Sequence, residues 1–477
     1  MISFRLTDTG DCSEGVANQT QTGWLVKSKY FTEFWELAKL SLPLVLAQVA
    51  QNATSFVDTI MVGRLGREAL AGIAIGSTVF MFVSIVASGF ILGCGAVVAQ
   101  AVGANDQDTC GRAVRQGGWL AVALFVPALV LFWNIYPVLI WLHQPPETAA
   151  ASSAYLRAIS WGLLPLLWSF AIRGLLEGHS NNPPIMVIAI VGVVLNVILN
   201  DLLMFGRWGL PELGLVGTGI ASSIVLSLTC LMYVGYALQR YPRLNLLRDL
   251  RTPDFSMLAQ LLRVGGPIGL TLACEVSMFS AAGIAMGRLG PDPLAAHQIA
   301  LQMGSLSFMV PLGISIAASA RIGQFAGAKN GKAAKVAGTV GIAVCGLIMV
   351  IFAVGFVVFN RGIVGYFLDL SDPENHSVVD LACQLLMIAA LFQVADGIQV
   401  SGSLALRGLK DTLAGFLITV FSYSVVGCGV GWWLCFQAGM RARGLWFGMT
   451  AGLATAAVLL VLRFYWRVGV EITTSKI

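Results

Sequence analysis

Three carboxylic acids lie within long apolar segments of the chain, where water cannot solvate an ionised carboxylate. Asp58 occurs in SFVDTIM, Glu275 in LACEV and Asp396 in FQVADG. An ionised side chain at the centre of a bilayer costs about 2.5–3.5 kcal/mol on insertion scales, so residues of this kind usually mark functional sites. Burial favours the neutral, protonated acid, whereas Na⁺ or an organic cation can compensate its ionised form. The three acids therefore predict competition between cations for one site, which is antiport in outline.

The elements that must carry these acids are membrane-spanning helices. The 477 residues are 57% hydrophobic and only 11% charged, whereas about 25% of the residues of soluble proteins are charged. A spanning helix needs roughly 20 mainly apolar residues. The pattern predicts an all-α integral membrane protein with about twelve such helices, at 38–62, 69–101, 113–141, 150–176, 184–206, 214–238, 257–287, 294–325, 334–358, 378–406, 413–437 and 444–468.

The distribution of positive charge predicts how the chain lies in the bilayer. A net charge of +5 could suggest a nucleic-acid partner, but the basic residues follow the membrane instead. With the N-terminus inside, most Lys and Arg fall at cytoplasmic helix ends, with clusters at 240–251 and 329–335. This bias places both termini in the cytoplasm and indicates a multi-pass protein that binds lipid and no nucleic acid. Residues 1–35 lack the basic-then-apolar order of a cleaved signal peptide.

The chain also repeats itself. Pro43 matches Pro267 and Gln100 matches Gln324 at one spacing of 224 residues, and Gly214 matches Gly444 at a spacing of 230. Because each half has an even number of predicted spans, we expect two lobes of one orientation, related by a pseudo-twofold axis along the membrane normal. A duplication without present functional meaning is the alternative. The predicted division is a cytoplasmic N-terminal tail (1–35), a six-helix lobe (36–240), a basic cytoplasmic linker (241–256), a second six-helix lobe (257–470) and a C-terminal tail (471–477).

The repeat provides an internal control for each acid. Asp58 aligns with Ala282, Glu275 aligns with Gln51, and Asp396 aligns with Leu166. The scaffold therefore tolerates a neutral residue at each position, which indicates that the acids bind a cation. The alternative is that they are protonated and hydrogen-bonded between helices.

Polar residues accompany the acids at helical spacing, and in lipid they must face protein or a water-filled cavity. Gln393, Asp396 and Ser403 share one side of their helix, and Gln399 lies between them in the sequence. Gln298 and Gln302 are spaced i, i+4, as are Asn196 and Asn200, and Thr218 begins the following helix. We expect these residues to be polar positions of a substrate cavity, although Asn196, Asn200 and Thr218 could equally form structural bonds between helices.

The sequence resembles the multidrug and toxic compound extrusion (MATE) family, within it the NorM-like branch. The residues that carry the resemblance are FVDTIMVGR at 56–64, CEV at 274–276, AHQIA at 296–300 and DGIQVSGSLALRGLKDT at 396–412. It covers about residues 36–468 and implies a V-shaped pair of lobes with a cavity between them. It also implies export of small amphiphilic cationic drugs, driven by inward flow of Na⁺ or H⁺ with no other cofactor. The resemblance places the protein in the inner (plasma) membrane of a bacterium, with a monomer as the default state.

The resemblance also assigns roles to the acids. It implies that Glu275 and Asp396 form the cation site of the C-terminal lobe, and would hold Na⁺ if sodium is the coupling ion, while Asp58 serves the N-terminal lobe. One branch of the family has an Asp where this chain has Asn200. We therefore expect ion coupling to depend on Glu275 and Asp396. We expect substitution of Asn200 to cost little transport activity.

Four other functions fit the sequence less well. A lipid-linked precursor flippase or an exporter of organic acids would need arginines in its cavity, whereas the charges within these helices are taken to be acidic. An intramembrane enzyme would need clustered catalytic residues, but the four histidines are scattered and no HExxH, GxSxG or phosphate-binding loop occurs. A channel would need repeated rings of pore-lining residues, which two unlike halves do not supply. The exported compounds and the choice between Na⁺ and H⁺ are left open.

Overall fold

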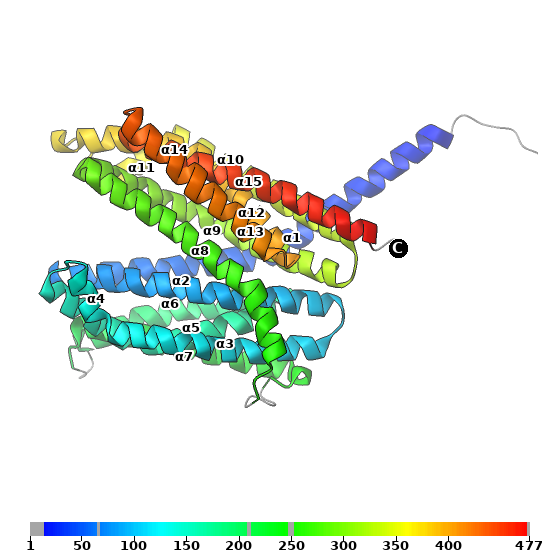
Figure 1. Cartoon of the computed structure of the whole chain (residues 1–477), viewed down its shortest axis with the longest axis horizontal. Coiled ribbons are helices and arrows are strands. Elements are labelled where there is room, and N and C mark those ends of the chain that lie inside the picture. The colour runs from blue at the N-terminus through cyan, green and yellow to red at the C-terminus, as the bar shows by residue number, and fades with distance from the viewer. Residues whose placement is uncertain (1–13, 64–66, 208–210, 247–251, 475–477) are drawn as a thin grey trace, which may run out of the picture.

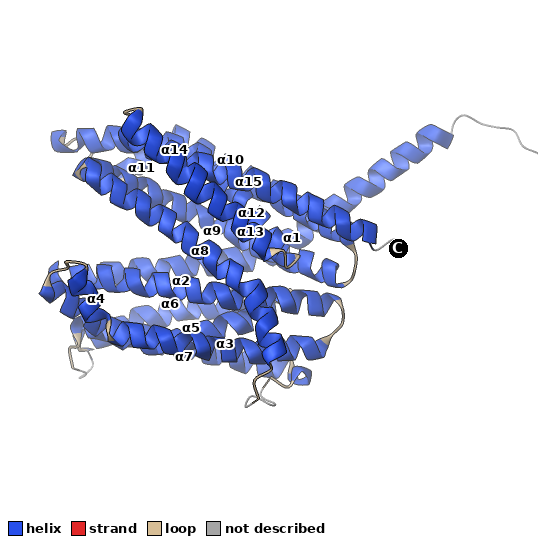
Figure 2. Cartoon of the chain, viewed as in Figure 1, coloured by secondary structure: helices blue, strands red, loops and turns tan. Residues whose placement is uncertain are grey.

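The computed structural model describes residues 14–63, 67–207, 211–246 and 252–474 (Figure 1). Helices dominate these ranges, and no strand occurs within them (Figure 2). The longer helices are α1 (Glu14–Gly63), α2 (Arg67–Gly103), α3 (Gln107–Trp133), α5 (Pro146–Gly178), α6 (Pro183–Phe205), α7 (Gly214–Arg240), α8 (Phe255–Leu289), α9 (Pro291–Gly327), α10 (Gly331–Val358), α12 (His376–Gly408) and α15 (Arg441–Thr474). The shorter ones are α4 (Ile135–Trp141), η2 (Pro242–Leu244), α11 (Asn360–Gly365), η3 (Pro373–Asn375), α13 (Thr412–Val420), η4 (Phe421–Gly427), α14 (Cys428–Trp432) and η5 (Trp433–Gln437).

The number of spanning helices agrees with the prediction. Among the described residues, eleven helical segments are long and apolar enough to cross a membrane. The 50-residue helix α1 is a further long helix, and it packs against α6 and α9. The chain is thus an all-α, multi-pass membrane protein with about twelve spans, as the sequence predicts.

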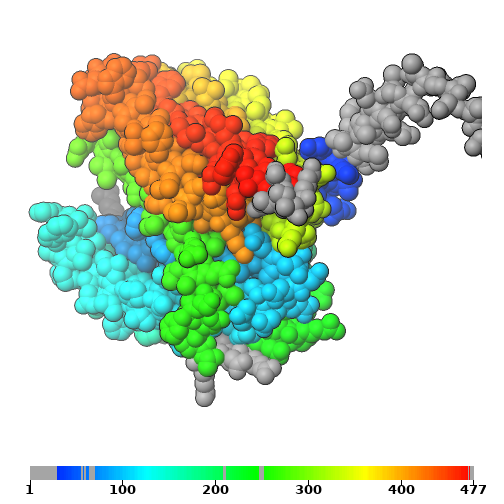
Figure 3. Space-filling model, turned by 45° about the vertical axis from the view of Figure 1, so that its right-hand side comes forward, coloured from blue at the N-terminus to red at the C-terminus, as the bar shows by residue number. Residues whose placement is uncertain are grey.

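The helices form two lobes, as the repeat predicts. Helices α2–α7 form one layer and α9–α15 form the other, while α1 and α8 cross between them (Figure 1). The two crossing helices are counterparts: α1 packs on α9 and α6, and α8 packs on α2 and α13. We call α1–α7 the N-lobe and α8–α15 the C-lobe. The space-filling view is notched between the lobes on the side of α4 and α14, which gives the V shape (Figure 3).

A proline at the repeated position in each crossing helix, and a glycine in α8, allow this crossing. Pro43 lies inside α1 and Pro267 inside α8, and α8 bends visibly along its length (Figure 1). A Cβ atom on Gly265 of α8 would lie only 1.8 Å from the Phe90 carbonyl oxygen of α2. The two helices can therefore approach this closely only because a glycine stands at the contact.

The repeat also extends to the helix starts. Asp106 caps α3 by accepting a hydrogen bond from the Thr109 amide at 3.0 Å, and Asn330 caps α10 by accepting one from Ala333 at 3.1 Å. Asp106 and Asn330 are separated by the repeat spacing of 224 residues. Both side chains satisfy amide groups that have no partner within their own helix.

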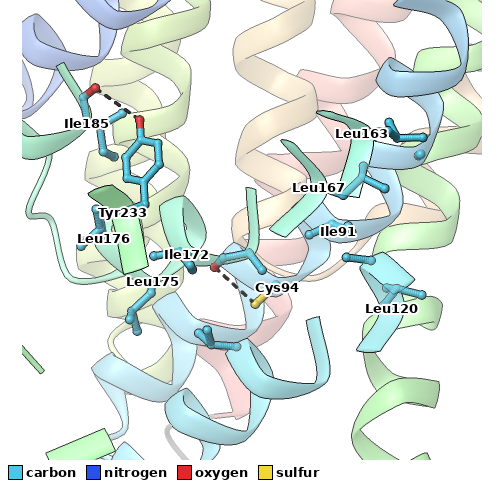
Figure 4. Packing of buried hydrophobic residues seen from close by; sticks show 14 of the residues in the cluster. Ile91, Cys94, Leu120, Leu163, Leu167, Ile172, Leu175, Leu176, Ile185 and Tyr233 are labelled. Carbon is cyan, nitrogen blue, oxygen red and sulfur yellow. Dashed lines mark hydrogen bonds between the residues drawn. The ribbon is translucent and has the colours of Figure 1, made fainter. Parts of the chain in front are cut away.

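Aliphatic packing holds the N-lobe together. Ile91 and Cys94 of α2 lie against Leu167, Ile172 and neighbouring residues of α5 (Figure 4). The Cys94 thiol donates to the Ala171 carbonyl at 3.9 Å, so it packs as a small buried side chain with a weak donor. The C-lobe has its own core around Trp446, Leu453 and Phe464.

Two segments differ from the predicted helices. Helix α1 begins at Glu14, so residues 14–35 of the predicted N-terminal tail are helical and continuous with the first span, while residues 1–13 lie outside the described part of the chain. The predicted helix 413–437 is a succession of α13, η4, α14 and η5, of which η4 and η5 are π-helical. Hydrophobic periodicity does not distinguish i→i+4 from i→i+5 hydrogen bonding, so the sequence could not indicate this irregularity.

Candidate functional site

The C-lobe brings together two of the three acids singled out from the sequence. Glu275 of α8 and Asp396 of α12 lie close enough for their charges to interact, and the Tyr423 hydroxyl of η4 lies within the influence of both. Asp396 and Tyr423 are buried, and Glu275 is partly so. We call these three residues the C-lobe centre. None of the ion pairs found among the described residues involves Glu275 or Asp396, so no fixed basic residue neutralises either acid there.

Several buried polar atoms of this lobe lack a partner among the described residues. Nearly all buried polar groups in proteins are hydrogen-bonded, so each exception calls for an ion or water to satisfy it. The atoms are Asp396 Oδ1, Tyr423 Oη, Ser422 Oγ, Gln393 Nε2 and His297 Nε2. The C-lobe centre therefore has free hydrogen-bonding capacity that a hydrated cation or a proton could use.

Tyr423 owes its place to the irregular helix around it. It lies in the π-helical segment η4, which packs against α8 and α15. A π-helical turn holds one extra residue, and such turns occur frequently at functional sites. The sequence analysis missed Tyr423. The signal that could have found it is the pair Ser422-Tyr423, which interrupts an otherwise apolar run.

Neighbouring residues fix the walls of this region. Gln393, one turn before Asp396 on α12, accepts a hydrogen bond from the Ser307 hydroxyl of α9. His297 Nδ1 accepts a hydrogen bond from the Trp446 indole at 3.2 Å, so His297 carries its proton on Nε2. These bonds join α9 to α12 and α15, and they hold the buried side of α12 in place.

The N-lobe contains a separate centre built on Asp58. The Asn200 amide donates to Asp58 Oδ1 at 2.6 Å and also lies 3.3 Å from Asn196 Oδ1, which joins α1 to α6. Thr218 of α7 is fully buried, and its hydroxyl and Asn200 Oδ1 have no partner among the described residues. We call Asp58, Asn196 and Asn200 the N-lobe centre. Asn196 and Asn200 thus lie with Asp58, and because the bond from Asn200 also joins two helices, both roles named in the sequence analysis are compatible with it.

The remaining polar candidates do not join either centre. Gln298 and Gln302 are exposed on α9, although His297, the neighbour of Gln298, is buried. Gln399 is buried on α12 and Ser403 is partly buried. The expected polar positions of the cavity are therefore divided between the interior of the C-lobe and an exposed face of α9.

The expectation that the charges within the helices are acidic is wrong. Arg173 of α5 is buried, donates to Gln48 Oε1 at 3.3 Å and to Gln51 Oε1 at 3.4 Å, and lies 3.8 Å from Glu177. These bonds use the arginine within the N-lobe. The sequence analysis did not single out Arg173 or Glu177, because both lie within the last two turns of α5, where charged residues are common.

The residues of the C-lobe centre suit a hard cation. Carboxylate and hydroxyl oxygens are the ligands that such cations prefer, and Glu275, Asp396 and Tyr423 supply both kinds. In the described chain, no group of three or more His, Cys, Asp or Glu residues forms a site for a tightly held metal ion. Two acids with an adjacent hydroxyl are therefore compatible with a loosely held Na⁺ or a proton.

Comparison with known proteins identifies the fold and the family. The MatE family model matches residues 43–202 and 267–433, which are the same two segments that repeat in the sequence. The chain belongs to the MATE family. It is 40% identical over 441 residues to the Probable multidrug resistance protein NorM of Pseudomonas putida, covering 91% of this chain and 95% of that protein. It is 38% identical over 444 residues to its namesake in Pseudomonas aeruginosa, covering 93% and 91%.

Solved structures agree on the fold of this MATE protein. The structure reported as the outward-facing conformation of a multidrug resistance MATE family transporter superposes with a TM-score of 0.82, covering 92% of this chain and 96% of that one. The two sequences are 20% identical, so the likeness concerns the fold alone. The family model and the NorM relatives, and not the solved structures, identify the protein as a membrane transporter of the NorM-like branch rather than an enzyme, as the sequence predicts.

Proposed function

We propose that this MATE transporter is a secondary active multidrug efflux antiporter, which exports amphiphilic organic cations in exchange for Na⁺ or H⁺. Glu275 and Asp396 bind the coupling cation in the C-lobe, and Asp58 binds a cation in the N-lobe. The observation that carries the proposal is the C-lobe centre, where two neighbouring acids have no basic partner among the described residues. A mobile cation can compensate such a pair, and a proton, Na⁺ or a cationic drug would compete to do so.

The internal repeat supports a mobile rather than a fixed partner. In the N-lobe, Gln51 occupies the position equivalent to Glu275 and binds Arg173. The position equivalent to Arg173 in the C-lobe, at the spacing of 230, is Ser403. The C-lobe thus carries the acid without the arginine that its N-lobe counterpart contacts.

The positive charges support the direction of transport. We define the basic end as the end that carries Arg243, Lys329, Lys332 and Lys410 in its connections. We infer from the positive-inside rule that this end, and with it both termini, faces the cytoplasm. We infer from the NorM relatives that the membrane is the bacterial inner membrane. The notch between the lobes lies at the opposite end (Figure 3). A cavity that opens there delivers its contents to the outside.

Aromatic side chains near the acids favour an amphiphilic cation. Phe279 and Phe392 lie with ring centroids 6.1 Å apart, and Phe392 and Trp446 lie 5.4 Å apart. Phe279 is partly exposed one turn after Glu275 on α8, whereas Phe392 and Trp446 are buried in the C-lobe core behind it. An aromatic face attracts cations and offers apolar contact, so Phe279 near Glu275 suits a drug with one positive charge and an apolar body. The relatives named as multidrug resistance proteins are consistent with this substrate class.

A lipid-linked precursor flippase is the main alternative, and the buried arginines bear on it. Arg173 is engaged by Gln48, Gln51 and Glu177, and Arg407 donates to the Leu92 carbonyl at 2.7 Å. Both guanidinium groups are thus bonded to the protein itself. An anionic pyrophosphate would have to displace these bonds, which makes a cationic cargo the better fit.

Resistance to a cationic drug in cells tests the proposal. Asp396→Asn and Glu275→Gln should abolish resistance while expression and membrane insertion stay at wild-type levels, because an amide cannot exchange a proton or balance Na⁺. Asp380→Asn is the matched control, since Asp380 lies on the same helix with an exposed side chain. Full resistance in cells that carry Asp396→Asn together with Glu275→Gln would refute the proposal.

A further inference from the structure

Side-chain hydrogen bonds between the lobes gather at the basic end. Gln100 of α2 donates to the carbonyl of Gly408, the last residue of α12, at 2.9 Å. Gln324 of α9 donates to the carbonyl of Gly178, the last residue of α5, at 2.8 Å. The last carbonyls of a helix have no partner within it, so each glutamine satisfies a group that would otherwise need water.

These two bonds are one interaction made twice. Gln100 and Gln324 are equivalent at the repeat spacing of 224, and Gly178 and Gly408 are equivalent at the spacing of 230. The N-lobe glutamine reaches the C-lobe helix, and the C-lobe glutamine reaches the N-lobe helix. The pair is therefore reciprocal about the pseudo-twofold axis.

The backbone contacts next to the two glutamines are also reciprocal. A Cβ atom on Gly103 would lie 1.9 Å from the Gln324 carbonyl oxygen, and one on Gly327 would lie 2.0 Å from that of Gln100. Only glycine permits helices α2 and α9 to cross so closely. Each glutamine thus extends from a backbone segment that is itself pressed against the opposite lobe.

A pair of opposite charges lies beside the glutamines. Glu177 and Arg407 are equivalent at the spacing of 230, and both line a pocket between the lobes together with Gly95 and Ser319. Arg407 crosses to the N-lobe, where it donates to the Leu92 carbonyl. One lobe thus presents an acid and the other a base at corresponding positions, and their attraction favours closure of this end.

We propose that Gln100 and Gln324 are a pair of positioning residues that latch the basic end closed, and that both latches must release before this end can open. The inference rests on the proposed transport function, because alternating access requires the two ends to open in turn. The symmetry gives the latch a specific property. Each glutamine contributes to closure by the same contact with a terminal helix carbonyl, and Gln324 also donates to the Ser180 hydroxyl at 3.0 Å. Removal of either should therefore favour opening, and removal of Gln324 at least as much as removal of Gln100.

Chemical accessibility tests this latch without measuring transport. A cysteine replaces Ser319, which is buried in the pocket between the lobes, and its rate of reaction with a membrane-impermeant maleimide is measured in the full-length protein in proteoliposomes. The protein without Ser319→Cys gives the background from the native cysteines. Gln100→Ala, Gln324→Ala and the double variant are compared with Gln116→Ala. Gln116 is a matched control because its amide also donates to a carbonyl, that of Thr252 at 3.2 Å, but does not join α2 or α9 to the opposite lobe.

The latch predicts a graded result. A hydrogen bond contributes about 1 kcal/mol net, so each single variant should increase the labelling rate about fivefold, and the double variant about twentyfivefold. Gln116→Ala should leave the rate unchanged. Unchanged labelling in both single variants and in the double variant would overturn the latch, and an increase from one glutamine alone would overturn its reciprocity. If the double variant fails to elute as a folded monodisperse protein, the two single variants decide. A failure of ion coupling would appear in transport and leave these labelling rates intact, so the two proposals fail separately.

Discussion

The crossing of α2 and α8 makes a sharp prediction about two adjacent glycines. A Cβ atom on Gly265 would lie 1.8 Å from the Phe90 carbonyl oxygen and 2.7 Å from its carbon, whereas one on Gly266 would meet only the edge of the Phe90 ring at 3.7 Å. Ordinary contact begins near 3.4 Å, so Gly265→Ala requires the two backbones to separate by more than 1 Å. Neither backbone can move aside as a flexible side chain would.

The two substitutions should change the stability of the protein differently. Alanine is about 0.8–1 kcal/mol better than glycine in a helix interior, but a Cβ at Gly266 precedes Pro267, whose ring crowds the residue before it. Gly266→Ala should therefore be close to neutral. Overpacking a rigid contact costs about 1–3 kcal/mol and occasionally more, so Gly265→Ala should be destabilising despite the same gain in propensity. The two variants are matched in chemistry, helix and depth.

The thermal midpoint of the purified protein in detergent measures this difference. We expect Gly265→Ala to melt below wild type, and Gly266→Ala to melt close to it. A midpoint for Gly265→Ala equal to or higher than that of Gly266→Ala would show that the helices do not cross as closely as described.

Three further predictions concern the two centres and a helix cap. Tyr423→Phe removes a buried hydroxyl of the C-lobe centre that has no hydrogen-bond partner among the described residues and that we propose as a ligand of the coupling cation. The apparent affinity for that cation should therefore fall about two- to tenfold; an unchanged affinity in a transport titration would contradict that role. Asn200→Ala removes the bond to Asp58, so the protein should lose about 1.5–3 kcal/mol of stability and melt at a lower temperature, while gradient-driven transport persists. Complete loss of transport would instead indicate that the coupling site lies in the N-lobe. Asp106→Ala should cost about 1 kcal/mol through loss of the α3 cap, and an unchanged midpoint would argue against the cap. Hydrogen bonds from Thr109 hold the pKa of Asp106 below its ordinary value, so this stabilisation is complete above about pH 4 and is lost as the pH falls further.

Regular features of the sequence were sufficient to predict the lobes. Long apolar segments predict spanning helices because each backbone amide must be satisfied within the helix in lipid. Pro43 and Pro267, or Gln100 and Gln324, recur at one spacing because the two lobes use the same contacts. The sequence thus shows which residues are equivalent in the two lobes. It does not show that these residues contact the opposite lobe across the pseudo-twofold axis.

The sites were predicted less completely, for physical reasons. Glu275 and Asp396 stand out because an acid in an apolar segment is costly, and the structure places them near each other. Tyr423 was missed because tyrosine carries no charge and lies on a π-helical turn that apolar periodicity cannot indicate. Arg173 was missed because a helix end in the sequence does not reveal whether another helix covers it, as α1 does here through Gln48 and Gln51.

The different roles that we propose for the two lobes also rest on particular contacts. In the N-lobe, Asp58 already accepts a short hydrogen bond from Asn200. In the C-lobe, Asp396 Oδ1 has no such partner among the described residues. A carboxylate that is not satisfied by its own protein gains more from a mobile cation, which is why we place the coupling at Glu275 and Asp396.

Uptake of a fluorescent aromatic cation into inside-out proteoliposomes tests this account most directly. A gradient of Na⁺ or of H⁺ is imposed separately, and Asp396→Asn is measured beside wild type and the Asp380→Asn control. We predict that one gradient drives uptake by wild type and the control, and that Asp396→Asn abolishes it. Equal gradient-driven uptake by folded Asp396→Asn protein would contradict the account.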